Sequence, residues 1–214
     1  MAESPRRYLK TREQRWPRTI ATALGNWGFR PNGVSVLSIV FAAAAGFALW
    51  RFGVVGGSWR LLVAAAVGIQ LRLLCNMLDG LLAVEGGFKS KLGDLYNEIP
   101  DRIADVAILV GAGYAVASQP YGEILGWSAA VLAVLTAYVR LLAGSLGAQQ
   151  LFIGPMAKQH RMFVVTLGCL IGAVEYGRFG TARAVWLALI VVVVGSVITF
   201  ARRLMRLGSE LESR

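Results

Sequence analysis

Six long apolar segments restrict the fold of this 214-residue chain more than any other feature. A segment of roughly 20 apolar residues can cross a bilayer, and its backbone polar groups must then be satisfied internally, as they are in a helix. With 56% hydrophobic residues, the sequence predicts an all-α integral membrane protein with six transmembrane helices. These helices are expected near residues 33–50, 60–84, 92–117, 124–146, 161–176 and 183–204.

A basic segment precedes the first of these helices. Within residues 8–27, Trp16, Ile20 and Leu24 repeat at helical spacing, which predicts an amphipathic helix lying in the lipid headgroup layer. A disordered basic tail is the alternative, because Pro17 interrupts the pattern. The expected organisation is a basic segment with an interfacial helix, a six-helix membrane domain and a polar tail, at residues 1–30, 31–206 and 207–214.

Lys and Arg gather beside alternate ends of the apolar segments. Cytoplasmic loops carry an excess of these residues, so both termini, the 85–91 loop and the site described below are expected in the cytoplasm. Compactness and composition favour a bacterial inner membrane. The residues that set this orientation are Arg6, Arg7, Lys10, Arg12, Arg15, Arg18, Arg30, Lys89, Lys91, Lys158, Arg161, Arg202, Arg203 and Arg206.

The formal net charge of +10 favours contact with an anionic partner. No basic stretch is interleaved with aromatic residues for base stacking, so nucleic acid is not expected. Attraction to anionic lipid headgroups explains the charge better. Cys75 and Cys169 both fall inside apolar segments and are expected to be small core residues.

Polar residues form two stripes within the second and third apolar segments. At about 100° per residue, Arg72, Asn76, Asp79 and Ala83 lie on one side of a helix. A second stripe on the next helix consists of Asp94, Asn97, Asp101 and Asp105. Ionisable groups in a membrane span are costly, so they generally face a cavity and mark a functional path.

The two stripes are expected to converge near the cytoplasmic ends of two consecutive antiparallel helices. Carboxylate and amide oxygens gathered in this way suit a hard divalent cation. Small residues at Gly80, Ala83 and Gly93 leave room for a ligand or another helix. The alternative is that the polar groups pair with Arg72 and with one another only to hold the helices together.

These residues resemble the signature of the CDP-alcohol phosphotransferases, membrane enzymes of phospholipid synthesis with the motif D-x-x-D-G-x-x-A-R, then G-x-x-x-D-x-x-x-D. Here the motif stands as Asn76-x-x-Asp79-Gly80-x-x-Ala83-Val84, then Gly93-x-x-x-Asn97-x-x-x-Asp101. The stretch "RPNGVS" before the first apolar segment, which includes Pro31 and Asn32, is similar to a P-N-x-x-T/S stretch of that family. The resemblance covers nearly the whole chain and includes the six spans.

The resemblance implies transfer of a phosphatidyl group from CDP-diacylglycerol to a small alcohol, with release of CMP. It also implies one or two divalent cations, Mg²⁺ or Mn²⁺, held by Asn76, Asp79, Asn97 and Asp101. The last of these residues, Asp101, is implied as the base that deprotonates the acceptor. Pro31, Asn32, Gly80, Ala83 and Gly93 are implied as residues that bind the CDP-lipid.

Three positions depart from the family motif. Asn76 and Asn97 supply amide oxygens without negative charge, so the four motif positions carry about −2 instead of about −4. We expect nearby Asp105, with Asp94 and Glu98, to offset this loss. Val84 replaces an arginine of the motif, and Arg72 and Lys91 are the nearest candidates to replace its charge.

The acceptor is expected to bind basic residues of other helices. Arg140, Lys158 and Arg161 are predicted at the same cytoplasmic level, where they suit an acceptor that already carries phosphate, such as glycerol 3-phosphate or an inositol phosphate. The alternative is that Lys158 and Arg161 only follow the cytoplasmic bias in charge. His160, the only histidine, is expected at the surface.

Two other functions agree with parts of the sequence. A relative that kept the fold but lost the chemistry would act as a lipid or nucleotide binder, and the two asparagines favour it. A small transporter would also place Asp and Arg in the membrane, but it would need polar residues through the full thickness. Small residues such as Gly111, Gly113, Gly144 and Gly147 permit close helix contacts within one subunit or in a homodimer.

Overall fold

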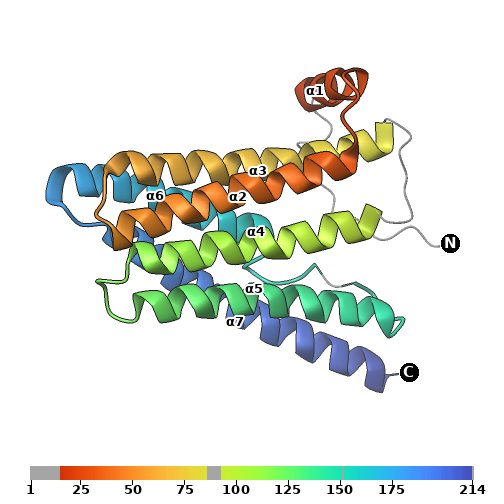
Figure 1. Cartoon of the computed structure of the whole chain (residues 1–214). Coiled ribbons are helices and arrows are strands. Elements are labelled where there is room, and N and C mark those ends of the chain that lie inside the picture. Colours follow the sequence, from red (N-terminus) through yellow and green to blue (C-terminus); the bar gives the residue numbers. More distant parts are fainter. Residues whose placement is uncertain (1–14, 86–92, 151, 214) are drawn as a thin grey trace.

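The computed structural model describes residues 15–85, 93–150 and 152–213. Over these residues the chain is all-helical, with seven helices and no strand. The helices are α1 Arg15–Asn26, α2 Pro31–Val54, α3 Trp59–Glu85, α4 Gly93–Ala115, α5 Gly122–Ser145, α6 Lys158–Phe179 and α7 Arg183–Glu212. Six of them run side by side as a bundle, while α1 runs crosswise to them on the outer side of α3, near one end of the bundle (Figure 1).

Five helices of the described chain are long and apolar enough to cross a membrane, namely α2, α3, α5, α6 and α7. The sequence predicts six such helices. Helix α4 has 23 residues, enough to cross, and it packs inside the bundle between α2 and α5. It falls outside the apolar set because its first half carries the charged residues Asp94, Glu98, Asp101, Arg102 and Asp105.

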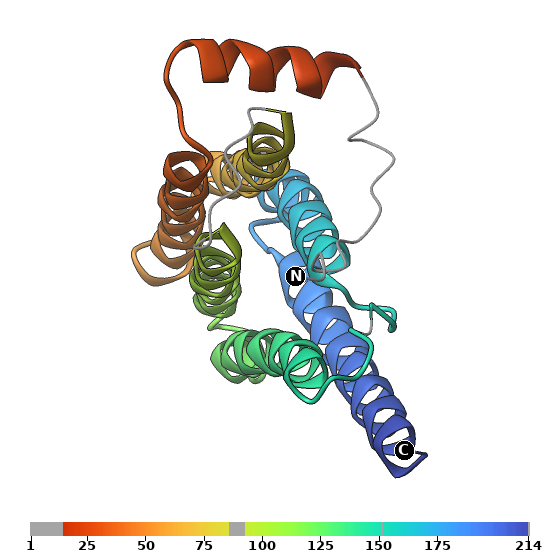
Figure 2. The ribbon, with the colours of Figure 1, turned by 90° about the vertical axis from the view of Figure 1, so that its right-hand side faces the viewer.

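The six bundle helices form a closed ring, and their order around the ring differs from their order in the chain. Helix α2 packs along both α3 and α4, α4 packs along α5, α5 along α7, α7 along α6, and α6 returns to α3. The end-on view shows this arrangement (Figure 2). Helices α3 and α4 follow each other in sequence, yet they contact each other only over a short region because α2 lies between them.

Glycines bring α2 and α4 together. A Cβ atom added to Gly111 would lie 2.4 Å from the backbone oxygen of Gly46, and one added to Gly46 would lie 2.4 Å from the oxygen of Ala107. Gly113 is similarly close to Gly126 of α5. Gly111 and Gly113, two of the glycines predicted to permit close contacts within a subunit or in a homodimer, therefore pack against other helices of this chain.

We expect Gly111→Ala to destabilise the protein by about 1–3 kcal/mol, because the new methyl group meets backbone that cannot rotate away. Gly177→Ala is the matched control, since a Cβ atom there meets nothing within 4 Å. Thermal unfolding of both variants in detergent measures the difference. Equal stability of the two variants would contradict the close contact between α2 and α4.

The first helix covers part of the predicted interfacial segment, and the last helix extends beyond its predicted end. Helix α1 begins at Arg15, and residues 8–14 of the predicted interfacial helix lie outside the described residues. Its Ala21 and Leu24 pack with Leu78 and Leu82 of α3, while Trp16 stays exposed. At the other end, α7 continues through residues 207–212, where a polar tail was expected, because Leu207 packs against Val139 and Ala143 of α5.

Candidate active site

The polar stripes of α3 and α4 do meet. Asn76 of α3 donates a hydrogen bond from Nδ2 to Asp101 Oδ1 of α4, at 2.8 Å. Arg72, one turn earlier on α3, donates from Nη2 to Asp101 Oδ1 at 3.2 Å and to Asp105 Oδ1 at 2.7 Å. These side chains connect α3 with α4, although α2 packs between the two helices and keeps most of their backbones apart.

Asp101 lies at the centre of this network. Its side chain is 6% exposed, and its second oxygen, Oδ2, accepts from Lys158 Nζ at the start of α6. One carboxylate therefore joins residues from α3, α4 and α6. The sequence predicted the role of Asp101 and Lys158 separately, but their contact spans 57 residues and leaves no trace in local spacing.

Asp79 faces the same region from α3. Its Oδ2 accepts a 2.6 Å hydrogen bond from Ser35 Oγ of α2, and Lys158 and Asp101 are both close enough to act on its charge. Ser35 also donates to the backbone oxygen of Pro31, at 3.2 Å, in the first turn of α2. The "RPNGVS" stretch thus reaches the site through its serine, a contact that the sequence did not reveal.

Asp105 lies one helical turn after Asp101 on α4 and is fully buried. One oxygen accepts from Arg72, and the other accepts from Arg161 Nη2 at 2.9 Å. Arg161 is 2% exposed and also donates from Nη1 to Thr136 Oγ1 at 3.3 Å and to the Met156 oxygen at 3.1 Å. Buried carboxylates that lack such partners are strongly destabilising, so these two guanidinium groups account for the burial of Asp105.

The remaining predicted residues lie around this network. Arg140 of α5 pairs with Glu98 Oε1 at 2.5 Å, and Arg102 pairs with the other oxygen of Glu98. Asn97 is exposed, at the opening turn of α4. The residues predicted to bind the CDP-lipid lie at the same end, at the start of α2, the end of α3 and the start of α4: Pro31, Asn32, Gly80, Ala83 and Gly93.

Some predicted contributors cannot be placed. Lys91 lies outside the described residues, and the side chains of Val84 and Asp94 are not described. Arg72, the other candidate to replace the charge of the motif arginine, hydrogen-bonds to Asp101. His160 is exposed, with Nδ1 2.8 Å from the Pro155 oxygen.

Helix α7 supports the site from outside, although it carries no predicted chemistry. Arg203 donates from Nε to the Ile153 oxygen at 3.0 Å, and Thr199 Oγ1 accepts from the Met156 amide at 2.9 Å. These bonds hold the segment that leads into α6. Gly154 has a φ of +112°, and a Cβ atom there would meet Thr199 at 2.5 Å, so the segment lies directly against α7.

The residues present suit a divalent cation when a substrate phosphate completes its coordination. Within the described part of the chain, no three His, Cys, Asp or Glu side chains are arranged as a metal site. Mg²⁺ needs only one or two carboxylates together with phosphate oxygens and water. The candidates for those carboxylates are Asp79 and Asp101, and the Asn76 amide hydrogen-bonds to Asp101.

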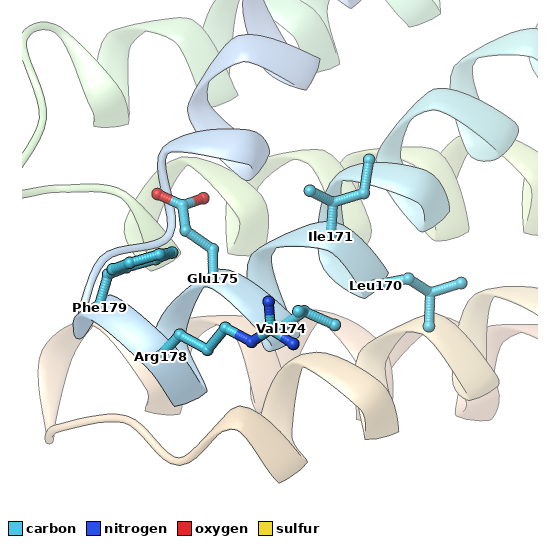
Figure 3. A pocket seen from close by; sticks show the side chains of 6 residues that line it. All are labelled: Leu170, Ile171, Val174, Glu175, Arg178 and Phe179. Atoms are coloured by element: carbon cyan, nitrogen blue, oxygen red, sulfur yellow. The ribbon is translucent and has the colours of Figure 1, made fainter.

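An apolar groove lies elsewhere, along the second half of α6. Its lining residues all belong to that helix and are Leu170, Ile171, Val174, Glu175, Arg178 and Phe179 (Figure 3). Glu175 accepts hydrogen bonds from the amides of Arg183 and Ala184, both at 3.0 Å, and so caps the start of α7. This groove is far along the helix from Lys158 and has no part in the network around Asp101.

Sequence comparisons relate the chain to two named synthases. No family model matches the chain. It is 25% identical over 175 residues to an archaetidylinositol phosphate synthase of Pyrococcus horikoshii, covering 80% of this chain and 85% of that protein. It is 26% identical over 195 residues to a phosphatidylinositol phosphate synthase of Mycobacteroides abscessus, covering 86% and 80%.

Solved structures of the phosphatidylinositol phosphate synthase of Mycobacterium tuberculosis have the same fold. The structure with CDP-DAG bound superposes with a TM-score of 0.77 at 25% identity, covering 91% of this chain and 94% of that one. The complex with manganese and citrate gives a TM-score of 0.75 at 25% identity, covering 89% and 88%. Both structural similarities therefore extend over nearly the whole bundle.

The apolar bundle, with its polar network between α3 and α4, defines an integral membrane enzyme of the phospholipid-synthesis class. The named synthases and the structures of similar fold indicate the CDP-alcohol phosphotransferase family, to which the spaced motif bears a resemblance.

Proposed function

We propose that this protein transfers the phosphatidyl group of CDP-diacylglycerol to a small alcohol that already carries phosphate, and releases CMP. The convergence of Asp101, Asp79 and Lys158 from three helices carries this proposal. This arrangement places two carboxylates, Asp79 and Asp101, next to the ammonium group of Lys158. The named relatives and the CDP-DAG complex of the tuberculosis enzyme support the donor.

Asp101 is the proposed base. It takes the proton of the acceptor hydroxyl as that oxygen bonds to the phosphatidyl phosphorus, while the phosphorus–oxygen bond to CMP breaks and CMP leaves with the electron pair. Asn76 and Arg72 hold Oδ1 of this carboxylate, which fixes its orientation. Among the described residues, only Lys158 contacts Oδ2, so this is the oxygen of Asp101 with fewer partners.

Asp79 and Asp101 would hold a divalent cation, Mg²⁺ or Mn²⁺, with the oxygen of Asn76 beside them. When bound, such a cation neutralises the diphosphate and orients it for in-line displacement. The manganese complex of the tuberculosis enzyme supports this assignment. The hydrogen bond from Ser35 fixes the orientation of Asp79. Asn97 is exposed, so we assign it to contact the substrate.

Asp105 and Arg161 are proposed to support the site, which differs from the roles expected from sequence. Both oxygens of Asp105 already bind guanidinium groups, and Arg161 already contacts Asp105, Thr136 and the Met156 oxygen. Arg140 and Lys158 are more exposed, with side chains 17% and 28% accessible, so we assign the acceptor phosphate to these two.

The six-span topology is part of the same proposal. Helix α4 crosses the membrane within the ring although it carries charges, because its carboxylates are paired with Arg72, Arg161, Lys158 and Arg140. Helix α1 runs crosswise beside α3, outside the ring and near the bundle end that holds the site, as expected for a helix in the headgroup layer (Figure 2). The site and both termini are assigned to the cytoplasmic side from the distribution of Lys and Arg.

A panel of acceptors tests this function. Purified protein, CDP-diacylglycerol and Mn²⁺ are mixed with an inositol phosphate, glycerol 3-phosphate, inositol, glycerol or serine, and CMP release is followed. The relatives' names contain inositol phosphate, so that acceptor comes first. We expect turnover with a phosphorylated alcohol and little with its unphosphorylated form, because Arg140 and Lys158 are cationic.

The two asparagines of the motif favour a second candidate, a protein that binds CDP-lipid without transferring it. They remove two of the negative charges that the motif supplies elsewhere in the family. Binding of CDP-diacylglycerol with no CMP from any acceptor would support this candidate.

A further inference from the structure

Lys158 occupies a position that a divalent cation would also need. It is the first residue of α6, and its ammonium contacts Asp101 Oδ2. The other oxygen of Asp101 is already taken by Arg72 and Asn76. A cation that binds Asp101 through Oδ2 therefore meets the ammonium of Lys158 at the same atom.

The contacts of Asp101 differ in how easily they can be exchanged. The Arg72 side chain is 0% exposed and is held at the same time by Asp105, so moving it would break a buried pair. The Lys158 side chain is 28% exposed, and its flexible stem can rotate toward solvent. Lys158 is the partner that can leave.

The charges of the network around Asp101 also oppose the addition of a further cation. Asp79, Asp101 and Asp105 carry three negative charges, and Arg72, Lys158 and Arg161 carry three positive ones, among the side chains that the structure describes. A divalent ion added without displacement would leave an excess of positive charge in surroundings of low dielectric constant, where repulsion is strong.

The start of α6 itself is fixed. Thr199 accepts from the Met156 amide, and Arg203 donates to the Ile153 oxygen, so α7 anchors the segment just before Lys158. An exchange at Asp101 therefore involves the lysine side chain and leaves the helix in place.

We infer that Lys158 is a competitor of the divalent cation at Asp101, so that the protein's affinity for the cation is set by displacement of this ammonium. The inference rests on the proposed function, because it assumes that Asp101 is a cation ligand. It makes Lys158 a positioning residue with two alternative partners, Asp101 and an anionic group of the substrate.

Titration of Mn²⁺ followed by electron paramagnetic resonance tests this competition without any turnover. The full-length protein in detergent is compared with Lys158→Met and with Arg140→Met. The second variant is a matched control, because Arg140 is a cation of the same site that pairs with Glu98 and does not touch Asp101. Lys158→Gln serves as a second test variant, and size-exclusion profiles verify folding.

We expect Lys158→Met and Lys158→Gln to bind Mn²⁺ about tenfold more tightly than the wild type, and Arg140→Met to change the affinity by about twofold or less. Equal effects of the Lys158 and Arg140 substitutions, or no change in the Lys158 variants while Mn²⁺ still binds, would overturn the inference and leave the proposed function intact. Absence of Mn²⁺ binding in every variant, with or without CDP, would overturn the inference and also the cation assignment of the proposed function.

Discussion

Asp101→Asn is expected to lower the rate of CMP release by at least about a thousandfold. A general base contributes roughly 10² to 10⁴ to a rate, and this substitution also removes a carboxylate from the proposed cation site. The Asn side chain keeps nearly the same shape, so its oxygen can still accept from Arg72 or Asn76. The loss should therefore appear in kcat more than in the amount of folded protein.

Glu98→Gln is the matched control for this substitution. It makes the same carboxylate-to-amide change on the same helix, at a carboxylate that pairs with Arg102 and Arg140 and does not contact Asp101. We expect it to retain most of the wild-type turnover at saturating acceptor. Comparable activity of Asp101→Asn and Glu98→Gln would remove Asp101 from the chemistry.

Asp105→Asn should destabilise the protein by about 3–5 kcal/mol. Asp105 is fully buried between Arg72 and Arg161, and removing one partner of a buried ion pair leaves the other charge uncompensated. Arg72 Nε and Nη1 and Arg161 Nε already lack hydrogen-bond partners among the described residues, so the remaining structure offers little compensation. Thermal unfolding in detergent measures the loss.

The same variant separates two roles for Asp105. As a support for the arginines, it should lower stability while the folded fraction keeps the wild-type affinity for Mn²⁺. As a ligand that offsets Asn76 and Asn97, it should weaken Mn²⁺ binding. Glu98→Gln again provides the comparison, because its ion pairs are partly exposed and are expected to contribute about 1 kcal/mol or less.

The helices of the bundle could be located from the sequence because each is a long apolar run with no alternative to helical hydrogen bonding in a membrane. The order of these helices around the ring could not be predicted from the sequence. Gly46 and Gly111 indicate that some helices approach closely, yet a glycine does not identify its partner, and α2 was not expected between α3 and α4. Such partners are fixed by packing between distant segments.

The same distinction applies to the site. Helical spacing placed Arg72 with Asn76, and Asp101 with Asp105, because each pair lies one turn apart on one helix. The pairing of Asp105 with Arg161 joins residues 56 positions apart, and that of Asp79 with Ser35 joins residues 44 apart. Spacing could identify which residues share a helix face, whereas the choice between ligand and support depends on these distant contacts.

Release of CMP by the purified protein tests the central claim most directly. Protein, CDP-diacylglycerol, Mn²⁺ and a phosphorylated alcohol are combined, each is then omitted in turn, and both CMP and the new lipid are quantified. We predict equal amounts of CMP and of a phosphatidyl-linked alcohol in the complete mixture, and neither product when any component is missing. Bound CDP-diacylglycerol that stays intact with every alcohol in the panel would contradict the account.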